Sequence, residues 1–347
     1  MHKTKIICTL GPSSFNKNIL KLLIKEKVDI FRINLSHTNI DEIKQKIKYL
    51  KKNKIKNICI DTEGAQVRTT HTKKKYFIKK NSVIEIFNEN ILSNNKKIYF
   101  YPYVDLNYIK IGTKIDIGFN SLSIEVIKKN LLSSSLLCRV IKGGYLESKK
   151  GVHIHSKINL PCLTEKDKYA LNLARKFNIK YFAISFVNHQ DDLEEVKKIV
   201  GQDSFVISKI ETQNAIINLD KISKHSNALL IDRGDLSRYV PIEKVPMAQE
   251  NIINRSKKLN IPTYVATNLL ENMIKENQPT RAESHDVYST LKEGAKGLVL
   301  AAETAIGANP VECVRFLKRC IKVFERSKKK KKLNTKDDKD YLFRIKS

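Results

Sequence analysis

The sequence predicts an α/β protein, a closed (β/α)₈ TIM barrel of parallel strands with a small β-domain inserted after strand three. Three observations predict this fold. Short β-branched runs alternate with amphipathic helical stretches, which is the pattern of parallel βαβ units. Eight such runs occur, the number that closes this kind of barrel. Residues 70–150 break the alternation, and their pattern predicts only β-strands. An open doubly wound sheet is the structural alternative.

The expected barrel strands are short apolar runs, most of them followed by a helical pattern such as Ile40–Lys52 or Asp191–Val200. In chain order these runs are Lys5–Leu10, Ile30–Leu35, Asn57–Asp61, Tyr181–Phe186, Phe205–Glu211, Ala228–Asp232, Thr263–Thr267 and Gly297–Ala302. The last barrel helix is expected near Glu312–Arg326. The predicted domains are residues 1–69 and 151–326 for the barrel, 70–150 for the insert and 327–347 for a basic polar tail.

Inside the insert, glycines separate short strand patterns. Gly112, Gly118 and the pair Gly143–Gly144 mark turns. The expected strands are Ser82–Phe87, Lys97–Tyr101, Lys114–Ile117, Ser123–Ile127 and Leu136–Lys142. A β-domain at this place could close over the barrel mouth as a lid.

Composition excludes several classes of protein. No run of about 20 apolar residues occurs, so no membrane span is expected. Met1–Lys5 leads directly into the apolar run Ile6–Leu10, which leaves no room for a secretory signal and predicts a cytoplasmic protein. None of the six cysteines forms a C-x-x-C pair, so free thiols are expected rather than a zinc site.

The formal net charge of +29 has two interpretations. A basic chain is typical of nucleic-acid binding. The lysines are nevertheless scattered over almost every polar stretch, which favours a biased codon composition and no specific nucleic-acid partner. The charge would still raise the local concentration of anionic substrates.

Polar residues gather at the expected carboxyl ends of the strands, where a (β/α)₈ barrel carries its chemistry. One such end has a structural explanation, for example a helix cap. Six on one rim would be costly to bury without partners or a ligand. The polar ends are Arg32–His37, Asp61–Gly64, Ser208–Glu211, Asp232–Leu236, Ala266–Asn268 and Ala302–Thr304.

The segments that carry these residues resemble, in order, the motifs of the pyruvate kinase family. The similarity spans residues 4 to about 325 and rests on long, spaced segments. They read TKIICTLGPSS, FRINLSH, IDTEGAQVRT, GGYLESKKGV, LPCLTEKD, SKIET, DRGDLS, VPIEKVPMAQ, ATNLLENMI, PTRAESHDV and ETAIGANPVE. The family's fold is a barrel with a β-domain inserted after strand three, which matches the fold expected here.

The resemblance implies a phosphotransferase of glycolysis that converts phosphoenolpyruvate and ADP to pyruvate and ATP, with Mg²⁺ or alternatively Mn²⁺ as cofactor. Phosphoryl transfer needs positioning and charge neutralisation. Glu211 and Asp235 are suited to hold the divalent ion. Lys209 lies on the same strand face as Glu211 and would stabilise charge on the phosphoryl group and the enolate oxygen. A helix cap, or a plain ion pair of Lys209 with Glu211, is the structural interpretation.

The resemblance also implies how the rest of the site works. Arg32 would bind the substrate phosphate as a fork donor, and Gly234 with Asp235 would hold the substrate carboxylate. Thr267 would lie near the methylene carbon, where a water relay brings the proton. The expected nucleotide-side residues are Pro12, Asn34, His37, Arg68 and Lys166. The expected oxygen ligands of a monovalent cation, K⁺, are Asn34, Ser36, Asp61 and Thr62, for which strand-end hydrogen bonding is the alternative.

Several residues depart from the family pattern, among them Ala65, Asn268 and the pair Ala301–Ala302. Glu63 and Gln66 replace the Lys and Glu of D-T-K-G-P-E, which leaves K⁺ dependence open. Asp232 replaces a small residue and either strengthens metal binding or pairs with Arg233. Ile117 replaces a carboxylate of Asp-Asp-Gly, an expected loss of nucleotide-metal contact.

The family's C-terminal effector domain has no counterpart in the sequence, which predicts a short form without control through that domain. A homodimer through barrel helices is left open, as are the effectors and the preferred nucleoside diphosphate. Two other functions stay open. One is a non-catalytic pyruvate-kinase-like binding protein, and the other is a pyruvate-enolate lyase or aldolase, which the retained Arg68 and Lys166 disfavour.

Overall fold

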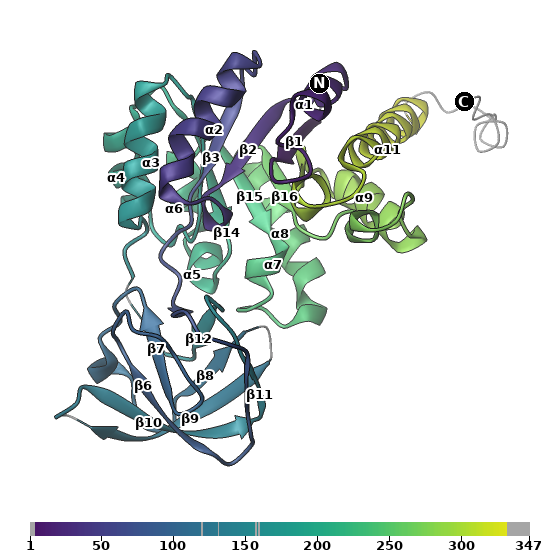
Figure 1. Cartoon of the computed structure of the whole chain (residues 1–347). Helices are drawn as coiled ribbons and strands as arrows, with labels where there is room; N and C mark the ends of the chain where they lie inside the picture. The colour runs from purple at the N-terminus through teal and green to yellow at the C-terminus, as the bar shows by residue number, and fades with distance from the viewer. Residues whose placement is uncertain (1–3, 119–120, 131, 157, 159, 332–347) are drawn as a thin grey trace. The chain divides into compact units, whose positions relative to one another are not determined.

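The computed structural model describes residues 4–118, 121–130, 132–156, 158 and 160–331. It divides into two compact units (Figure 1). One unit comprises Met1–Thr62 and Lys166–Ser347, and the other comprises Glu63–Glu165.

The first unit contains the closed barrel of eight parallel strands that the sequence predicts. Closure is made by the first and last barrel strands, where Cys8 pairs with Leu300 in register, so the open doubly wound alternative is wrong. Around the barrel the order is β1-β17-β16-β15-β14-β13-β3-β2. The bounds are β1 (Lys5–Thr9), β2 (Ile30–Asn34), β3 (Ile58–Asp61), β13 (Tyr181–Ile184), β14 (Phe205–Ile210), β15 (Ala228–Asp232), β16 (Thr263–Ala266) and β17 (Gly297–Leu300).

Apolar side chains fill the barrel between these strands, among them Ile7, Ile207 and Val299. The largest of them is Tyr264, whose ring is buried against the backbone of Gly297. A Cβ atom on Gly297 would lie 2.5 Å from Tyr264 Cδ1, so only glycine fits there. The interior is a packed core, which leaves chemistry to the strand ends.

The helices follow the strands. Helix α9 illustrates which residues begin and end a helix of this unit. Thr280 and Glu283 form a capping box at its start, and Gly294, with φ 116°, ends it. The helices are α1 (Lys17–Lys25), α2 (Ile40–Lys52), α3 (Glu165–Lys176), α4 (Gln190–Val200), α5 (Gln213–Ile217), α6 (Leu219–His225), α7 (Arg233–Leu236), α8 (Val245–Lys258), α9 (Arg281–Glu293), α10 (Ala302–Ala305) and α11 (Pro310–Lys331).

Helix α11 continues past Arg326, where the sequence places its end, to Lys331. The remainder of the expected basic tail, residues 332–347, lies outside the described residues. Short 3₁₀ turns complete the unit at η1 (Leu35–His37), η3 (Ile242–Lys244) and η4 (Glu271–Ile274).

The second unit is the inserted β-domain. It has a seven-stranded sheet in the order β12-β8-β9-β10-β6-β7-β4 and a two-stranded sheet of β11 and β5. The five strands that the sequence predicts appear as β6 (Val83–Phe87), β7 (Lys97–Tyr101), β8 (Lys114–Ile117), β9 (Leu122–Asn130) and β10 (Ser135–Lys142). The sequence missed β4 (Arg68–Thr69), β5 (Tyr76–Ile78), β11 (Gly144–Leu146) and β12 (Val152–Ile154). The unit also has the short turn η2 (Leu106–Tyr108).

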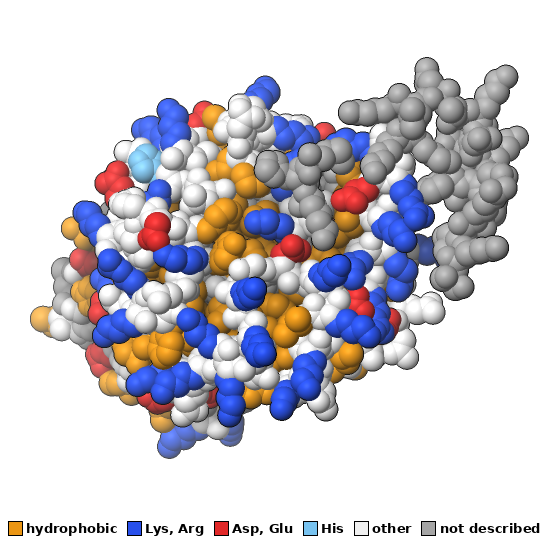
Figure 2. Space-filling model, turned by 90° about the horizontal axis from the view of Figure 1, so that it is seen from above, with side chains coloured by type: hydrophobic (Ala, Val, Ile, Leu, Met, Phe, Trp, Pro, Cys, Tyr) orange, Lys and Arg blue, Asp and Glu red, His pale blue; other side chains and the backbone are white. Residues whose placement is uncertain are grey.

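The sequence also led to expectations about membrane spans, cysteines and the distribution of basic side chains. None of the described helices combines the length and apolarity that a membrane crossing needs. All six cysteines are free thiols, and all but Cys320 are buried. On the face seen in Figure 2, Lys and Arg side chains are spread among hydrophobic and neutral ones and form no separate basic stripe.

Candidate active site

A buried lysine surrounded by carboxylates lies at the carboxyl ends of β14 and β15. Lys209, on β14, is 5% exposed. Its Nζ lies 2.9 Å from Glu211 Oε1, 3.4 Å from Asp232 Oδ2 and 3.5 Å from Asp61 Oδ1. The ammonium donates a 3.0 Å hydrogen bond to Ser185 Oγ. Four strand ends, those of β3, β13, β14 and β15, thus converge on one cation.

This environment shifts the pKa values of the cluster. Burial raises the pKa of Glu211 to about 8, and the neighbouring Asp235 and Asp232 add to the rise, although Lys209 opposes it. Burial alone would lower the pKa of Lys209, but Asp61, Glu211 and the other carboxylates raise it well above the usual range. Lys209 therefore stays charged, and it is outnumbered by the carboxylates that act on it, those of Asp61, Glu211, Asp232 and Asp235.

The shortage of positive charge fits a divalent metal. Glu211, Asp232 and Asp235 each offer one carboxylate oxygen, and these oxygens lie within 4.8 Å of one another. Glu211 Oε1 is buried and receives no hydrogen bond of acceptable geometry, while its Oε2 accepts one from the Phe186 N–H at 2.6 Å. Oxygen-rich, anionic sites of this kind suit Mg²⁺ or Mn²⁺. The residues present therefore fit the ion that the sequence implies.

Arg32, on β2, is held at the edge of the same cluster. It is buried, and its Nη1 lies 3.0 Å from Asp61 Oδ2 while its Nε donates to Thr9 Oγ1 at 2.8 Å. Thr9 in turn donates to the Leu300 carbonyl at the end of β17. Two of the guanidinium's donors are thus used for orientation, and Arg32 and Lys209 lie on either side of Asp61.

Asp232 takes a position that the sequence left undecided. It does not pair with its neighbour Arg233, which instead forms an ion pair with Asp286 at 2.8 Å. Asp232 contacts Lys209 and accepts a 2.7 Å hydrogen bond from Thr267 Oγ1. The extra carboxylate therefore belongs to the lysine and metal cluster and also reaches Thr267, at the end of β16.

The expected K⁺ ligands lie on neighbouring strand ends, with Asn34 opposite Asp61 in register. Several of their oxygens are already used. Asn34 Oδ1 accepts from the Ser36 N–H at 2.9 Å, and Thr62 accepts two hydrogen bonds from Ser185, one at Oγ1 and one at its carbonyl. Asp61 Oδ1 receives no hydrogen bond from the part of the chain that the structure describes. A monovalent site here stays a prediction.

The expected nucleotide-side residues fall in both units. In the barrel unit, Pro12 and His37 are exposed at the ends of β1 and β2. Lys166 donates to the Leu35 carbonyl at 2.6 Å, so it lies beside the end of β2, and its role toward a nucleotide stays a prediction. Arg68 belongs to the second unit, where it donates to the Lys149 carbonyl at 3.4 Å.

Two of the residues that depart from the family pattern, Ile117 and Gln66, lie in the second unit. Ile117 is fully buried in the core of that unit, so a carboxylate at this position would be desolvated. Asp116 hydrogen-bonds Ser123 and His155. Gln66 is buried, and its Oε1 has no hydrogen-bond partner among the described residues.

Sequence reasoning missed two residues of the site, Ser185 and Thr9. Ser185 follows β13, accepts from Lys209 and donates to the Thr62 carbonyl at 2.6 Å. It lies one residue before the end of the predicted strand Tyr181–Phe186, where a serine by itself does not distinguish an active site from an ordinary strand end. Glu303, at the eighth strand end, has a structural role instead. Its carboxylate accepts hydrogen bonds from the N–H groups of Leu270 and Ala301.

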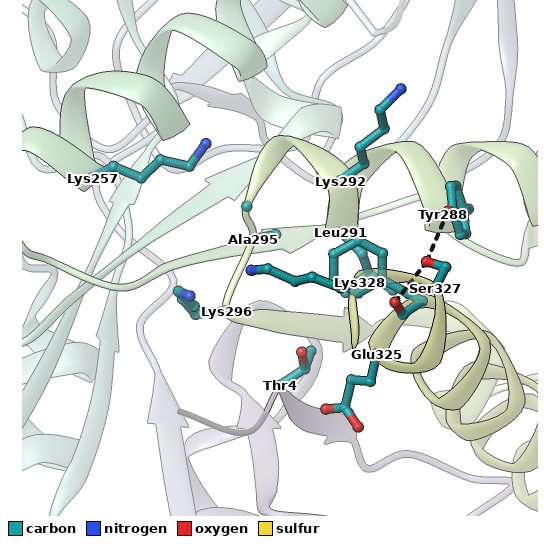
Figure 3. A pocket seen from close by; sticks show the side chains of 12 residues that line it. Thr4, Lys257, Tyr288, Leu291, Lys292, Ala295, Lys296, Glu325, Ser327 and Lys328 are labelled. Carbon is teal, nitrogen blue, oxygen red and sulfur yellow. Dashed lines mark hydrogen bonds between the residues drawn. The ribbon is translucent and has the colours of Figure 1, made fainter. Parts of the chain in front are cut away.

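A cavity of about 460 Å³ lies at the opposite, amino-terminal ends of β1 and β17 (Figure 3). Thr4 and Lys296, which precede these strands, help to line it, and Tyr288 hydrogen-bonds Ser327 at its wall. Its other lysines, Lys257, Lys292 and Lys328, are exposed. Since it contains none of the converging strand-end residues, we place the chemistry at the carboxyl ends instead.

Proteins similar to this chain are known over most of its length. A family model described as pyruvate kinase, barrel domain, matches residues 1–314. The pyruvate kinase of Thermotoga maritima is 33% identical over 337 residues, covering 94% of this chain and 72% of that relative. Those of Staphylococcus epidermidis and Staphylococcus aureus are each 32% identical over 96% of the chain. The chain spans only 59% of the length of these two staphylococcal relatives.

Proposed function

This chain belongs to the pyruvate kinase family, and from that premise we propose that it transfers the phosphoryl group of phosphoenolpyruvate to ADP. The products are ATP and an enolate, which is protonated to pyruvate. We place this activity in glycolysis in the cytoplasm. The observation that carries the proposal is the buried Lys209 ammonium, set among the carboxylates of Glu211, Asp232 and Asp61 beside the Arg32 guanidinium.

In this proposal Arg32 and Lys209 bind the transferring phosphoryl group. Both are buried and charged, and a fixed charge in a water-poor site needs no reorganisation when charge moves in the transition state. Arg32 offers a planar fork for two phosphate oxygens. Lys209 offers a point charge, first to the phosphoryl group and then to the enolate oxygen left behind.

Glu211 and Asp235 would hold Mg²⁺ or Mn²⁺, with Asp232 as a third carboxylate within reach. When bound, the ion would neutralise charge on substrate oxygens as a Lewis acid. Gly234 and Asp235, in the first turn of α7, would orient the substrate carboxylate. Thr267 would hold the water that supplies the proton to the methylene carbon.

For the second substrate we propose a nucleoside diphosphate, ADP, on the side of Pro12, Asn34, His37 and Lys166 of the barrel unit. Arg68, which the family resemblance assigns to the nucleotide phosphates, belongs to the second unit. K⁺ would use Asn34, Ser36, Asp61 and Thr62. Gln66 carries no charge, so a requirement for K⁺ is the part of this proposal with the least support from the residues present.

One assay tests the proposal. The full chain is supplied with phosphoenolpyruvate, ADP and Mg²⁺, with K⁺ or Na⁺ as the only monovalent cation, and ATP and pyruvate are both measured. Equal amounts of the two products support the proposal. Carbon–carbon cleavage or condensation without ADP would indicate a lyase or aldolase, and tight phosphoenolpyruvate binding without turnover would indicate a binding protein.

A further inference from the structure

Thr267 has a backbone conformation that a β-branched residue rarely adopts. Its φ is 77°, and the following Asn268 has φ 56°. Positive φ at a β-branched residue is a genuine outlier, which persists only where surrounding contacts impose it. Thr267 directly follows β16, and its hydroxyl contacts Asp232 of the candidate site. The contacts that impose this conformation therefore also decide where its hydroxyl points.

Two of those contacts come from Arg233. Its Nε donates to the Thr267 carbonyl at 3.0 Å, and its Nη2 donates to the same oxygen at 2.6 Å. The third nitrogen, Nη1, lies 2.8 Å from Asp286 Oδ1 on α9. All three guanidinium nitrogens are thus committed, and Asp286 fixes the guanidinium plane from outside the site.

The side chain of Thr267 is fixed as well. Its hydroxyl donates to Asp232 Oδ1 at 2.7 Å. The absence of a side chain at Gly234 makes room for its methyl group, since a Cβ there would lie 3.0 Å from Thr267 Cγ2. Because its one proton is directed at Asp232, the hydroxyl presents only lone pairs to the rest of the site. A group that faces Thr267 must therefore donate to it, as a water molecule can.

We propose that Arg233 and Asp286 are positioning residues that hold Thr267 in this conformation, and that they serve the proton-transfer half of the reaction. The inference rests on the proposed function. A water molecule donates one hydrogen bond to Thr267 Oγ1 and directs its other proton at the enolate carbon. The new C–H bond forms as that O–H bond of the water breaks, and the hydroxide left behind regains a proton from bulk solvent.

The proposal separates two halves of one reaction. Arg233 and Asp286 touch neither Lys209 nor Arg32 in any hydrogen bond or ion pair of the described residues. Thr267 contacts Asp232, which is the third carboxylate, while Glu211 and Asp235 are the proposed ligands of the ion. Removing the Asp286 charge should therefore change phosphoenolpyruvate and metal binding little. It should slow the exchange of the methyl protons of pyruvate, which is the reverse of enolate protonation.

The experiment measures deuterium uptake into the methyl group of pyruvate in D₂O with Mg²⁺, by NMR, in four variants. Asp286→Asn should slow uptake about tenfold, because misplacement of a reacting group by a fraction of an ångström has effects of this order. Thr267→Ala should slow it about 100-fold. The double variant should lie within about twofold of Thr267→Ala, because no hydroxyl remains to be positioned. Asp286→Glu should restore most of the rate.

A matched control is Asp220→Asn, which breaks the exposed ion pair of Asp220 with Arg255 on α8 and should leave uptake unchanged. The Mn²⁺ dissociation constant, measured by electron paramagnetic resonance, should be the same in Asp286→Asn as in the unmodified protein. If the slowing by Asp286→Asn multiplies with that of Thr267→Ala, or if Mn²⁺ affinity falls with it, the positioning role is wrong. If the unmodified protein turns over neither phosphoenolpyruvate nor pyruvate, the proposed function itself has failed, and this inference with it.

Discussion

Replacing Lys209 by Met removes a single charge from the centre of the site and keeps much of the side-chain volume. The ammonium lies between 2.9 and 3.5 Å from three carboxylate oxygens, so it can also lie within about 4 Å of a phosphoryl oxygen. Two unit charges at that separation interact by about 4 kcal/mol at an effective dielectric constant of about 20. This is a loss of about 1,000-fold in kcat.

The same substitution should also destabilise the metal-free protein, by about 3–5 kcal/mol, because it leaves buried carboxylates without their cation. ADP affinity should stay nearly intact, because no nucleotide-side residue contacts Lys209 among the bonds described. The assay is steady-state formation of pyruvate and ATP at saturating substrates, with ADP affinity measured separately by calorimetry. Lys209→Arg, which keeps the charge but changes its geometry, is the matched control and should retain more activity.

Turnover of Lys209→Met within about threefold of the unmodified protein would remove Lys209 from the mechanism, since a lost charge cannot leave an electrostatic transition state unaffected. A parallel fall in ADP affinity would instead indicate that the substitution had disturbed the fold of the site. Thermal unfolding with and without Mg²⁺ separates these cases.

Three further predictions follow from particular contacts. Burial first, and then Asp235 and Asp232, raise the pKa of Glu211 to about 8. The carboxyl is thus protonated below that pH, and Mg²⁺ affinity by calorimetry should rise from pH 6 to pH 8 and then level off; a flat profile would contradict this. Arg32→Lys keeps the charge but loses the fork that bonds Thr9 and Asp61, so the KM for phosphoenolpyruvate should rise about tenfold or more while that for ADP stays the same. Gly297→Ala places a Cβ 2.5 Å from Tyr264 Cδ1 and should lower the free energy of unfolding by about 1–3 kcal/mol; an unchanged denaturation midpoint would show that the barrel interior can yield there.

Much of the fold was predictable because its signals are long and repeated. Each barrel strand is a short run of mostly buried, mostly apolar residues, and most of the eight runs are followed by a helix. The missed strands of the insert lack such a signal. β4 has two residues, and β5, β11 and β12 have three each, which is too short for an alternating pattern to show.

The convergence of Lys209, Glu211 and Asp235 was predictable for a topological reason. Parallel strands deliver their ends to one rim, so polar residues at those ends must meet. The interaction partner of each side chain was not predictable. Asp232 and Arg233 are adjacent in sequence, yet one faces Lys209 and the other faces Asp286. The chain turns from β15 into α7 between these two residues, and the direction in which each side chain points depends on tertiary packing.

Ser185 illustrates a second limit. A serine after an apolar run is as common in a plain strand end as in an active site, so its type carries little information. Its role appears only when β13 is placed beside β14, where Ser185 accepts from Lys209 and donates to Thr62. The left-handed backbone of Thr267 is likewise a property of contacts rather than of residue type.

The claim on which the whole account depends is that one divalent ion binds at Glu211 and Asp235 within reach of Lys209. A crystal structure of the protein grown with Mn²⁺, with anomalous diffraction data, tests it directly. The account predicts a single strong anomalous peak that both carboxylates ligate, lost in Glu211→Gln. A peak elsewhere, or none at saturating Mn²⁺, would contradict it.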